Sequence, residues 1–410
     1  MLTRRTFVRG SLVAVAGGIA MPNIFARALQ VAASDHVSDA GTRTLIVIQL
    51  AGGNDGLNTV VPYQDSVYLQ SRPTIGVKAA EALPLDGRLA LHPNLKELKG
   101  IWDQGHLAIV ESVGYDHPSL SHFQSMDIWQ TADPTQGRRD GWLSKLVEGM
   151  VDSQGHPLGA LALGAGLPPA LCCPPIPPPV VDRADRYRLL SDPRHPELRS
   201  SRDEALQKLY ASYQAPAPYA ALLEATSESA ATSSTFLQQL GTSYTPSVAY
   251  PESTLADGLK LFAALIGGGH GLRIGYILLG GFDTHADQLK RQPQLLATLS
   301  GALGAFYADL AAQGKAEDVL VVTWSEFGRR VAENASGGTD HGTAAPLFVL
   351  GGAVKGGLYG EPPDLHQLDD GNLTFAVDFR GVYASVLEQW LQADADAVLG
   401  QKFDQIPLLG

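Results

Sequence analysis

Six short apolar runs along the chain have the length and composition of buried β-strands. Each is nearly continuous in apolar residues rather than alternating between apolar and polar positions. Such runs are typical of parallel sheets in which helices cover both faces. The predicted strands span residues 44–50, 106–113, 158–163, 273–279, 318–324 and 346–350.

Between these runs lie stretches that we predict to be helical. Because strand and helix alternate along the chain, the pattern indicates a doubly wound α/β fold. In open sheets of this kind, binding sites form at the carboxyl ends of the strands. The predicted helices span residues 93–104, 119–131, 141–151, 255–265, 286–312 and 379–393.

The alternation is interrupted over residues 166–252. Residues 167–181 contain Pro-Pro, Cys-Cys-Pro-Pro and Pro-Pro-Pro, which an ordinary helix or central strand excludes. Residues 203–242 are rich in Ala, Ser and Gln and have helical character, with a break at two prolines. We therefore expect residues 29–165 and 253–410 to form one core domain, and the intervening segment to form an insertion or cap on it.

The first 28 residues have the features of an export signal. Arg4 and Arg5 open a charged segment, an apolar stretch follows over residues 10–21, and Ala26-Arg27-Ala28 fits the rule for a cleavage site. The paired arginines are typical of twin-arginine export, which would place the mature protein in the periplasm or outside the cell. The alternative is an uncleaved amphipathic helix, but residues 1–28 contain four arginines and no acidic residue, which favours a cleaved signal peptide.

Charge and apolar length narrow the range of partners. The 410 residues include 30 Lys and Arg against 42 Asp and Glu, and cleavage of the signal would leave 26 against 42, a net charge near −16. Such a surface does not attract phosphate backbones, so the sequence predicts no nucleic-acid partner. No apolar stretch after the signal predicts a membrane span. Cys172 and Cys173 are neighbours, which excludes an ordinary disulfide and a zinc-ribbon motif.

Polar side chains gather where the predicted strands end. A single Asp or His in a loop usually caps a helix or forms a turn. Here, however, five successive elements each bring an acidic residue, a histidine or both, among glycines. Together they predict a metal site, whose candidate ligands are Asp55, Asp283, His285, Glu326, Asp340 and His341.

The donor chemistry of this set indicates which ion it would hold. Asp283 and His285 are two residues apart, so on an extended chain both side chains point the same way. A carboxylate with an imidazole suits zinc, manganese or iron better than calcium, which prefers oxygen ligands alone. We therefore expect a divalent metal, zinc or manganese, as one or two ions.

Three further residues are candidates for catalysis. Ser121 lies near the start of a predicted helix, where a hydroxyl beside a metal ion could act as a nucleophile, although a helix N-cap explains it equally well. His122 could be a base, a ligand or a packing residue. Arg329 could clamp an anionic group through two hydrogen bonds, or form an ion pair with Glu326 or Asp340.

Five short motifs of the chain resemble those of one known family, the exported domain-of-unknown-function family 1501. That family carries twin-arginine signals and is placed in the alkaline phosphatase/sulfatase superfamily. The resemblance covers nearly all of the mature chain and is weakest over residues 166–252. The motifs are Gly-Gly-Asn-Asp-Gly at 52–56, Ser-His-Phe at 121–123, Phe-Asp-Thr-His at 282–285, Ser-Glu-Phe-Gly-Arg at 325–329 and Thr-Asp-His-Gly at 339–342.

The resemblance implies a three-layer α/β/α sandwich with a mostly parallel sheet, one or two metal ions, and a nucleophile on the helix after an early strand. By this resemblance Asp55 and Asp283 match metal-binding acids and His341 matches a late histidine ligand. Ser121 occupies the place of the nucleophile, and Glu326 stands where the superfamily has an Asp-His pair.

Three departures from the superfamily pattern change these expectations. The residue four after Asp283 is Asp287 rather than a histidine, and Phe327 follows Glu326 where a histidine would follow an Asp. One of the two metals is therefore expected to be absent or bound differently. The nearest matches to the Cys/Ser-x-Pro-x-Arg motif of sulfatases with a modified residue end in Ile176 and His195, so a sulfatase of that kind is not expected.

These expectations combine into one leading hypothesis and two alternatives. The leading hypothesis is an exported, metal-dependent hydrolase of phosphate or sulfate esters, either small molecules or glycans, with Ser121 or a metal-bound water as the nucleophile. The first alternative is a non-catalytic binding protein on the same fold. The second is a mutase that transfers a phosphoryl group within a sugar phosphate.

Overall fold

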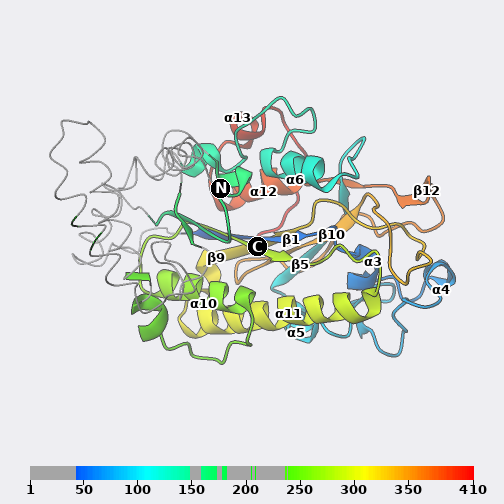
Figure 1. Ribbon diagram of the computed structural model, residues 1–410, viewed down its shortest axis with the longest axis horizontal. Helices are drawn as coiled ribbons and strands as arrows, with labels where there is room; N and C mark the ends of the chain where they lie inside the picture. The colour runs from blue at the N-terminus through cyan, green and yellow to red at the C-terminus, as the bar shows by residue number, and fades with distance from the viewer. Residues whose placement is uncertain are drawn as a thin grey trace.

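A central β-sheet organises the part of the chain that the computed structural model describes, which is residues 43–147, 158–172, 178–181, 205, 208, 236, 237 and 239–410. Nine strands of the described chain form this sheet, in the order β11-β5-β10-β9-β1-β8-β6-β7, with β14 also pairing with β5. Their bounds are β1 Thr44–Ala51, β5 Leu107–Gly114, β6 Ala160–Leu163, β7 Val180–Val181, β8 Ile274–Gly280, β9 Val319–Trp324, β10 Ala345–Leu350, β11 Gly357–Tyr359 and β14 Val377–Asp378. In Figure 1 the sheet runs through the middle of the molecule, with β1, β5, β9 and β10 labelled.

The strand directions confirm a mostly parallel sheet. β10 runs antiparallel to both of its neighbours, β9 and β5, and the other pairs are parallel. No described helix crosses back over the sheet between β9 and β10, so the chain returns in the opposite direction. The loop over residues 325–344 therefore begins and ends at the same edge of the sheet, where the carboxyl ends of β1, β8 and β9 lie.

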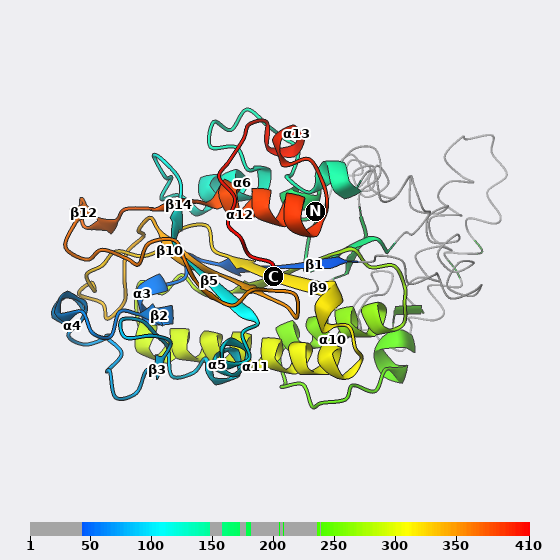
Figure 2. The same cartoon turned by 180° about the vertical axis from the view of Figure 1, so that it is seen from behind.

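Helices cover both faces of the sheet, which gives the α/β sandwich its three layers (Figures 1 and 2). Ile46, Ile48 and Leu50 of β1 pack in the core below the sheet, whereas Leu45 and Val47 pack in the core above it. This alternation explains the continuous apolar run, because both faces of the strand are buried. The lower layer contains α5 Lys96–Asp103, α10 Thr254–Gly267 and α11 Gln288–Ala312, and the upper layer contains α6 His122–Thr131, α12 Phe379–Ser385 and α13 Ala395–Leu399.

Shorter elements complete the described chain. A three-stranded sheet has the order β2-β4-β3, and β12 pairs with β13. Their bounds, with those of the remaining short helices, are α3 Gly56–Thr59, β2 Val60–Val61, α4 Ser66–Ser71, β3 Leu83–Pro84, β4 Ala90–Leu91, η1 Pro169–Leu171, η3 Ala316–Asp318, β12 Leu368–Asp369, β13 Asn372–Leu373 and η4 Val386–Trp390.

The helix α6 begins three residues later than the sequence predicts. The Tyr115 hydroxyl accepts a hydrogen bond from the Ser119 backbone N–H at 2.9 Å, which holds the preceding residues in a turn. Ser121 thus becomes the N-cap of α6, and His122 becomes its first residue.

By length and composition, α11 is an exception to the prediction that no apolar stretch after the signal could span a membrane. Half of that stretch is buried within the fold, and Leu296, Leu299 and Phe306 lie in the lower core. This burial is typical of a core helix. The predicted signal peptide and most of the predicted insertion lie outside the described residues.

Candidate metal centre

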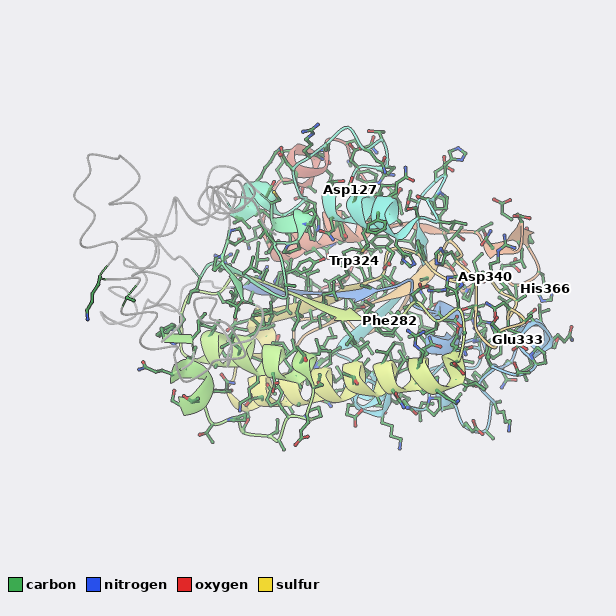
Figure 3. All side chains as sticks on the ribbon, in the orientation of Figure 1. Asp127, Phe282, Trp324, Glu333, Asp340 and His366 are labelled. Carbon is green, nitrogen blue, oxygen red and sulfur yellow. The ribbon has the colours of Figure 1, made fainter. Side chains whose placement is uncertain are left out.

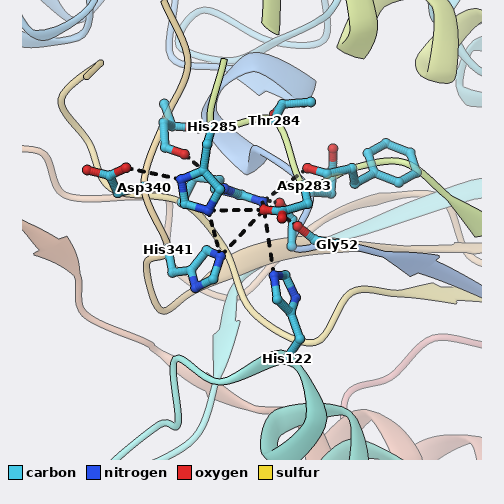
Figure 4. A network of polar contacts seen from close by, with 12 residues as sticks. Gly52, His122, Asp283, Thr284, His285, Asp340 and His341 are labelled. Carbon is cyan, nitrogen blue, oxygen red and sulfur yellow. Dashed lines mark hydrogen bonds and ion pairs between the residues drawn. The ribbon is translucent and has the colours of Figure 1, made fainter. Parts of the chain in front are cut away.

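Two loops meet at the carboxyl edge of the central sheet. One follows β8 and the other joins β9 to β10, and both face the first turn of α6 (Figure 4). In Figure 3, Asp340 lies toward the loop-rich end of the molecule, together with Glu333 and His366. The fold thus brings together polar motifs that are more than 200 residues apart in sequence, as with His122 and Glu326.

Three histidine rings point toward one carboxylate oxygen. The Nε2 atoms of His285, His341 and His122 lie 3.1, 3.4 and 3.6 Å from Asp283 Oδ1. The Nε2 atoms of His285 and His341 lie 2.9 Å from each other (Figure 4). We call these four residues the His/Asp cluster.

In each histidine of the His/Asp cluster, the other ring nitrogen, Nδ1, makes a hydrogen bond that fixes the orientation of the ring. His122 Nδ1 lies 2.8 Å from Glu326 Oε1, and His285 Nδ1 lies 3.1 Å from Asp340 Oδ1. An ionised carboxylate can only accept, so both Nδ1 atoms carry the proton. His341 Nδ1 donates in the same way to the backbone oxygen of Leu120, at 2.8 Å.

This pattern leaves a lone pair on every Nε2 of the cluster. The Nε2 atoms of His285 and His341 therefore face each other at 2.9 Å without a proton between them. His122 Nε2 is buried and has no hydrogen-bond partner among the described residues. Lone pairs and a carboxylate oxygen that converge in this way are matched by a cation, and neutral imidazoles fixed through Nδ1 are typical metal ligands.

The donor atoms of His122, Asp283 and His341 lie close enough together to hold a single small ion. A tetrahedral zinc ion with bonds of about 2.0–2.1 Å separates its donor atoms by roughly 3.3 Å. The ligand atoms of His122, Asp283 and His341 all lie within 4.8 Å of one another, and His341 and His122 Nε2 are 3.4 and 3.6 Å from Asp283 Oδ1. Two imidazoles and one carboxylate make a donor set that zinc accepts, and His285 lies beside them, 2.9 Å from His341.

The charges around Asp283 keep its carboxylate ionised. Burial opposes ionisation, but the hydrogen bond and charge of Arg329 hold the pKa of Asp283 below its usual value, and protonation of His285 or His122 would lower it further. Burial lowers the pKa of His341, although its hydrogen bond to Leu120 opposes this shift. Both shifts favour the forms that bind a metal, a carboxylate and a neutral imidazole.

Arg329 does not have the clamp role that the sequence allowed for it. Its side chain is fully buried, and all of its nitrogens donate to the protein. It therefore has no free edge for a substrate group, and its ion pair with Asp283 at 2.7 Å makes it an organiser of the site. Its partners are the backbone oxygens of Gly52, Gly53, Phe282 and Thr339 and the Asp283 carboxylate.

Gly52 allows the loops to pack this closely. Its φ is +121°, and a Cβ at this position would lie 2.3 Å from the backbone nitrogen of Asp283. Its own N–H donates to Glu326 Oε1 at 2.8 Å, so the carboxylate that orients His122 is itself held in place. A glycine is thus required for both the conformation and the close approach.

Asp55 is buried in a separate polar network, and none of its contacts within the described chain is with the His/Asp cluster. One of its oxygens caps α3 by accepting from the Asn58 N–H, and the other pairs with Arg72 Nη1 at 2.6 Å. Both side chains of this ion pair are fully buried. The predicted ligand is therefore committed to a structural ion pair.

Two other predicted ligands are hydrogen-bonded to histidines of the cluster and do not belong to the cluster themselves. Glu326 is fully buried and orients His122, while Asp340 orients His285. Asn334 donates to Asp340 at 3.0 Å, and this bond, with that of His285, lowers the pKa of Asp340. The structure thus brings together three predicted ligands, Asp283, His285 and His341, and adds His122 to them.

Ser121 lies beside the cluster at the N-cap of α6. Its side chain is exposed and makes no capping hydrogen bond within the described chain, so capping does not consume its hydroxyl. Its neighbours on both sides belong to the site, since the Leu120 carbonyl orients His341 and His122 is in the cluster.

Sequence reasoning missed the residues that organise the site from outside. Arg72, Gln288 and Asn334 are the clearest cases. None stands at the end of a predicted strand, and a buried arginine or glutamine has no local sequence signature. The role of the Leu120 carbonyl could not be predicted either, because every residue has a backbone carbonyl and the residue type therefore gives no signal.

Comparison with known proteins gives a family and a set of remote structural matches. The model of a family described as "Protein of unknown function (DUF1501)" matches residues 42–379. No curated protein matches the sequence.

The structural matches are all distant. The PsFucS1 sulfatase from Pseudoalteromonas sp. is 11% identical, with 94% of this chain and 74% of that chain covered and a TM-score of 0.40. A protein in the alkaline phosphatase superfamily from Vibrio parahaemolyticus is 9% identical, with coverages of 82% and 70% and a TM-score of 0.34. The alkaline phosphatase from the Antarctic bacterium TAB5 is 11% identical, with coverages of 78% and 95% and a TM-score of 0.32.

Proposed function

The chain belongs to the DUF1501 family of proteins of unknown function, and from that premise we propose that it is an exported, metal-dependent hydrolase of phosphate or sulfate esters. The observation that carries the proposal is the convergence of three Nε2 lone pairs on Asp283 Oδ1. The compact group of His122, Asp283 and His341 supports one bound ion, zinc in preference to manganese, because two of its three donors are imidazoles. Export is inferred from the signal-like residues 1–28.

The exposure of the cluster favours catalysis over a purely structural ion. The side chains of Asp283 and His285 are 47% and 44% exposed. Structural zinc sites are closed by their ligands, whereas catalytic sites remain accessible to water and substrate. An ion at this edge would face solvent and could accept an ester oxygen.

Residues around the cluster would have separate roles in holding the ion and in keeping its ligands oriented. A divalent ion in the cluster would act as a Lewis acid on an ester oxygen and lower the pKa of the attacking hydroxyl. Glu326, Asp340 and the Leu120 carbonyl keep the three Nε2 lone pairs aimed inward. Arg329 keeps Asp283 ionised.

Ser121 is the nucleophile favoured by position, with water as the alternative. Its hydroxyl is exposed at the N-terminus of the ten-residue helix α6. The positive end of a helix stabilises an oxyanion, and the backbone N–H groups of its first turn can donate to a phosphate or sulfate group. The attacking hydroxyl would lose its proton and form a bond to phosphorus or sulfur while the bond to the alcohol oxygen breaks, and the alcohol would leave with a proton taken from water. With Ser121 as nucleophile, a water molecule would then cleave the serine ester and release phosphate or sulfate.

Metal content and turnover of the same preparations test the proposal. We expect about one zinc per chain by mass spectrometry, lost in His341→Ala and kept in His366→Ala, an exposed histidine whose ion pair is with Asp65. We expect turnover of 4-nitrophenyl phosphate or sulfate to follow the metal.

The outcomes separate the alternatives. Protein that binds no divalent metal after reconstitution would refute the proposal. Bound metal without turnover across a panel of phosphate and sulfate esters would identify a binding protein. If Ser121→Ala keeps full turnover, water is the nucleophile.

A further inference from the structure

We propose that Gln288 is a positioning residue that sets the distance between the two histidine-bearing loops of the metal site. The proposal rests on the metal site proposed above. Gln288 is the first residue of α11 and its side chain is 1% exposed. It does not touch the His/Asp cluster, and it acts through the residues beside the ligands.

One oxygen of Gln288 joins the two loops. Its Oε1 accepts from the hydroxyl of Thr284 at 3.1 Å and from the hydroxyl of Thr339 at 2.8 Å. Thr284 stands between Asp283 and His285, and Thr339 is two residues before His341. A single buried acceptor therefore sits behind three of the four ligands.

The two loops are in direct contact at the same place. The Thr339 N–H donates to the Thr284 backbone oxygen at 3.2 Å. A Cβ added to Gly338 would lie 2.2 Å from that oxygen, so the loops are packed at the closest distance that the backbone allows. Any loss of the shared acceptor would act directly on this contact.

The orientation of the Gln288 amide is fixed by Asp55. Gln288 Nε2 donates to Asp55 Oδ2, the same carboxylate oxygen that accepts from Arg72 Nη1 at 2.6 Å. The amide oxygen must then face the threonines, which must both donate. The buried Asp55–Arg72 pair thus sets the direction of the hydrogen bonds that reach Thr284 and Thr339.

This role gives the aspartate of the Gly-Gly-Asn-Asp-Gly motif a function without making it a ligand. Gln292, one turn further along α11, donates to the Asp55 backbone oxygen at 2.9 Å and holds the motif from the same helix. The N-terminal turn of α11 is therefore attached to β1's loop on one side and to the ligand loops on the other.

The test is metal affinity, measured by competition with a zinc chelator. Thr339→Val removes the hydroxyl but keeps the shape, and Gln288→Met removes the acceptor. We expect each to weaken zinc binding about tenfold, within the range for residues that orient ligands. The double variant should bind no more weakly than the weaker single variant, because both changes break the same bond. Thr339→Ser should restore affinity.

The matched control is Thr44→Val at the opposite end of β1. Thr44 is buried, and its hydroxyl donates to the Leu272 backbone oxygen at 2.7 Å. We expect this variant to lower the melting temperature and leave zinc affinity unchanged. If Thr339→Val and Gln288→Met lower the melting temperature but bind zinc like the wild type, the positioning role is refuted while the metal site stands.

A protein that binds no metal would refute the proposed function and still leave a readout for Gln288. Histidine-selective NMR of the metal-free protein reports the environment of each ring. Thr339→Val should shift the His285 and His341 ring signals, and Thr44→Val should not. Unshifted signals would refute the positioning role independently.

Discussion

Glu111 gives the protein a pH-dependent stability that can be calculated from its surroundings. The residue lies on β5 with 3% of its surface exposed, and its Oε1 is buried without a partner within the described chain. It lines a small, mainly apolar pocket with Leu57, Pro346 and Leu373. Burial raises the pKa of the Glu111 carboxyl to about 8, and the charge of Asp86 adds to the shift.

The sign of the effect follows from proton counting. Between pH 4.5 and about 8 the folded protein keeps the Glu111 proton, whereas the unfolded chain has lost it. Stability therefore falls as pH rises, by about 1.4 kcal/mol per pH unit. From pH 5.5 to 7.5 this gives a loss of about 3 kcal/mol.

The perturbation that isolates this effect is Glu111→Gln, which keeps the shape and removes the titration. Urea unfolding at pH 5.5, 6.5 and 7.5 gives the free energy of unfolding at each pH. The difference in unfolding free energy between wild type and variant cancels the contributions of all other titrating groups. One of these is His92, whose pKa is lowered to about 4 by burial, so that its contribution to stability rises with pH. Glu361→Gln, at an exposed position, is the matched control.

We expect the free energy of unfolding of the wild type, relative to that of Glu111→Gln, to fall by about 3 kcal/mol across this pH range. The difference in unfolding free energy between the wild type and Glu361→Gln should stay constant. Parallel pH profiles for wild type and Glu111→Gln would refute the reasoning. That result would mean that the carboxyl is ionised in the fold, with water or a rearrangement compensating its burial.

Three further predictions concern the buried ion pair, the metal and export. Arg72→Met leaves the buried Asp55 carboxylate without its cation, and we expect a loss of about 3–5 kcal/mol in urea unfolding, with partial recovery in the double variant Asp55→Asn/Arg72→Met. Zinc at one hundred times its Kd should stabilise the protein by about 2.7 kcal/mol in calorimetry, and Asp283→Asn or a chelator should abolish this gain. Replacing Arg4 and Arg5 by lysine should retain the protein in the cytoplasm, as cell fractionation would show; unchanged export would contradict the signal assignment.

The main strands could be predicted because a strand that is buried on both faces has a continuous run of apolar residues in the sequence. The run at 44–50 became β1, with all but its last residue buried, and the other long runs became strands within one or two residues of their predicted ends. The direction of β10 could not be predicted, since it depends on the loop over residues 325–344 rather than on the strand's own composition.

For the candidate site, the sequence could predict only those residues whose position in the fold is determined by the end of a strand. Asp283, His285 and His341 follow or precede strands directly, and they converge. His122 depended on where α6 begins, which a tyrosine hydroxyl decides. Asp55 also lies at a strand end, but its direction was set by Arg72, a partner that no local pattern reveals.

The guanidinium of Arg329 has a consequence for how this family can diverge. Because one side chain binds the backbones of the loops after β1 and β8 and of the segment before β10, none of these loops can change length without releasing the others. Insertions and deletions at this edge would therefore be selected against together. Evolution of a new substrate preference is left to described segments that Arg329 does not bind, such as the turn at 115–121. We expect related sequences to keep a constant spacing within the Arg329-bound loops and to vary more in that turn.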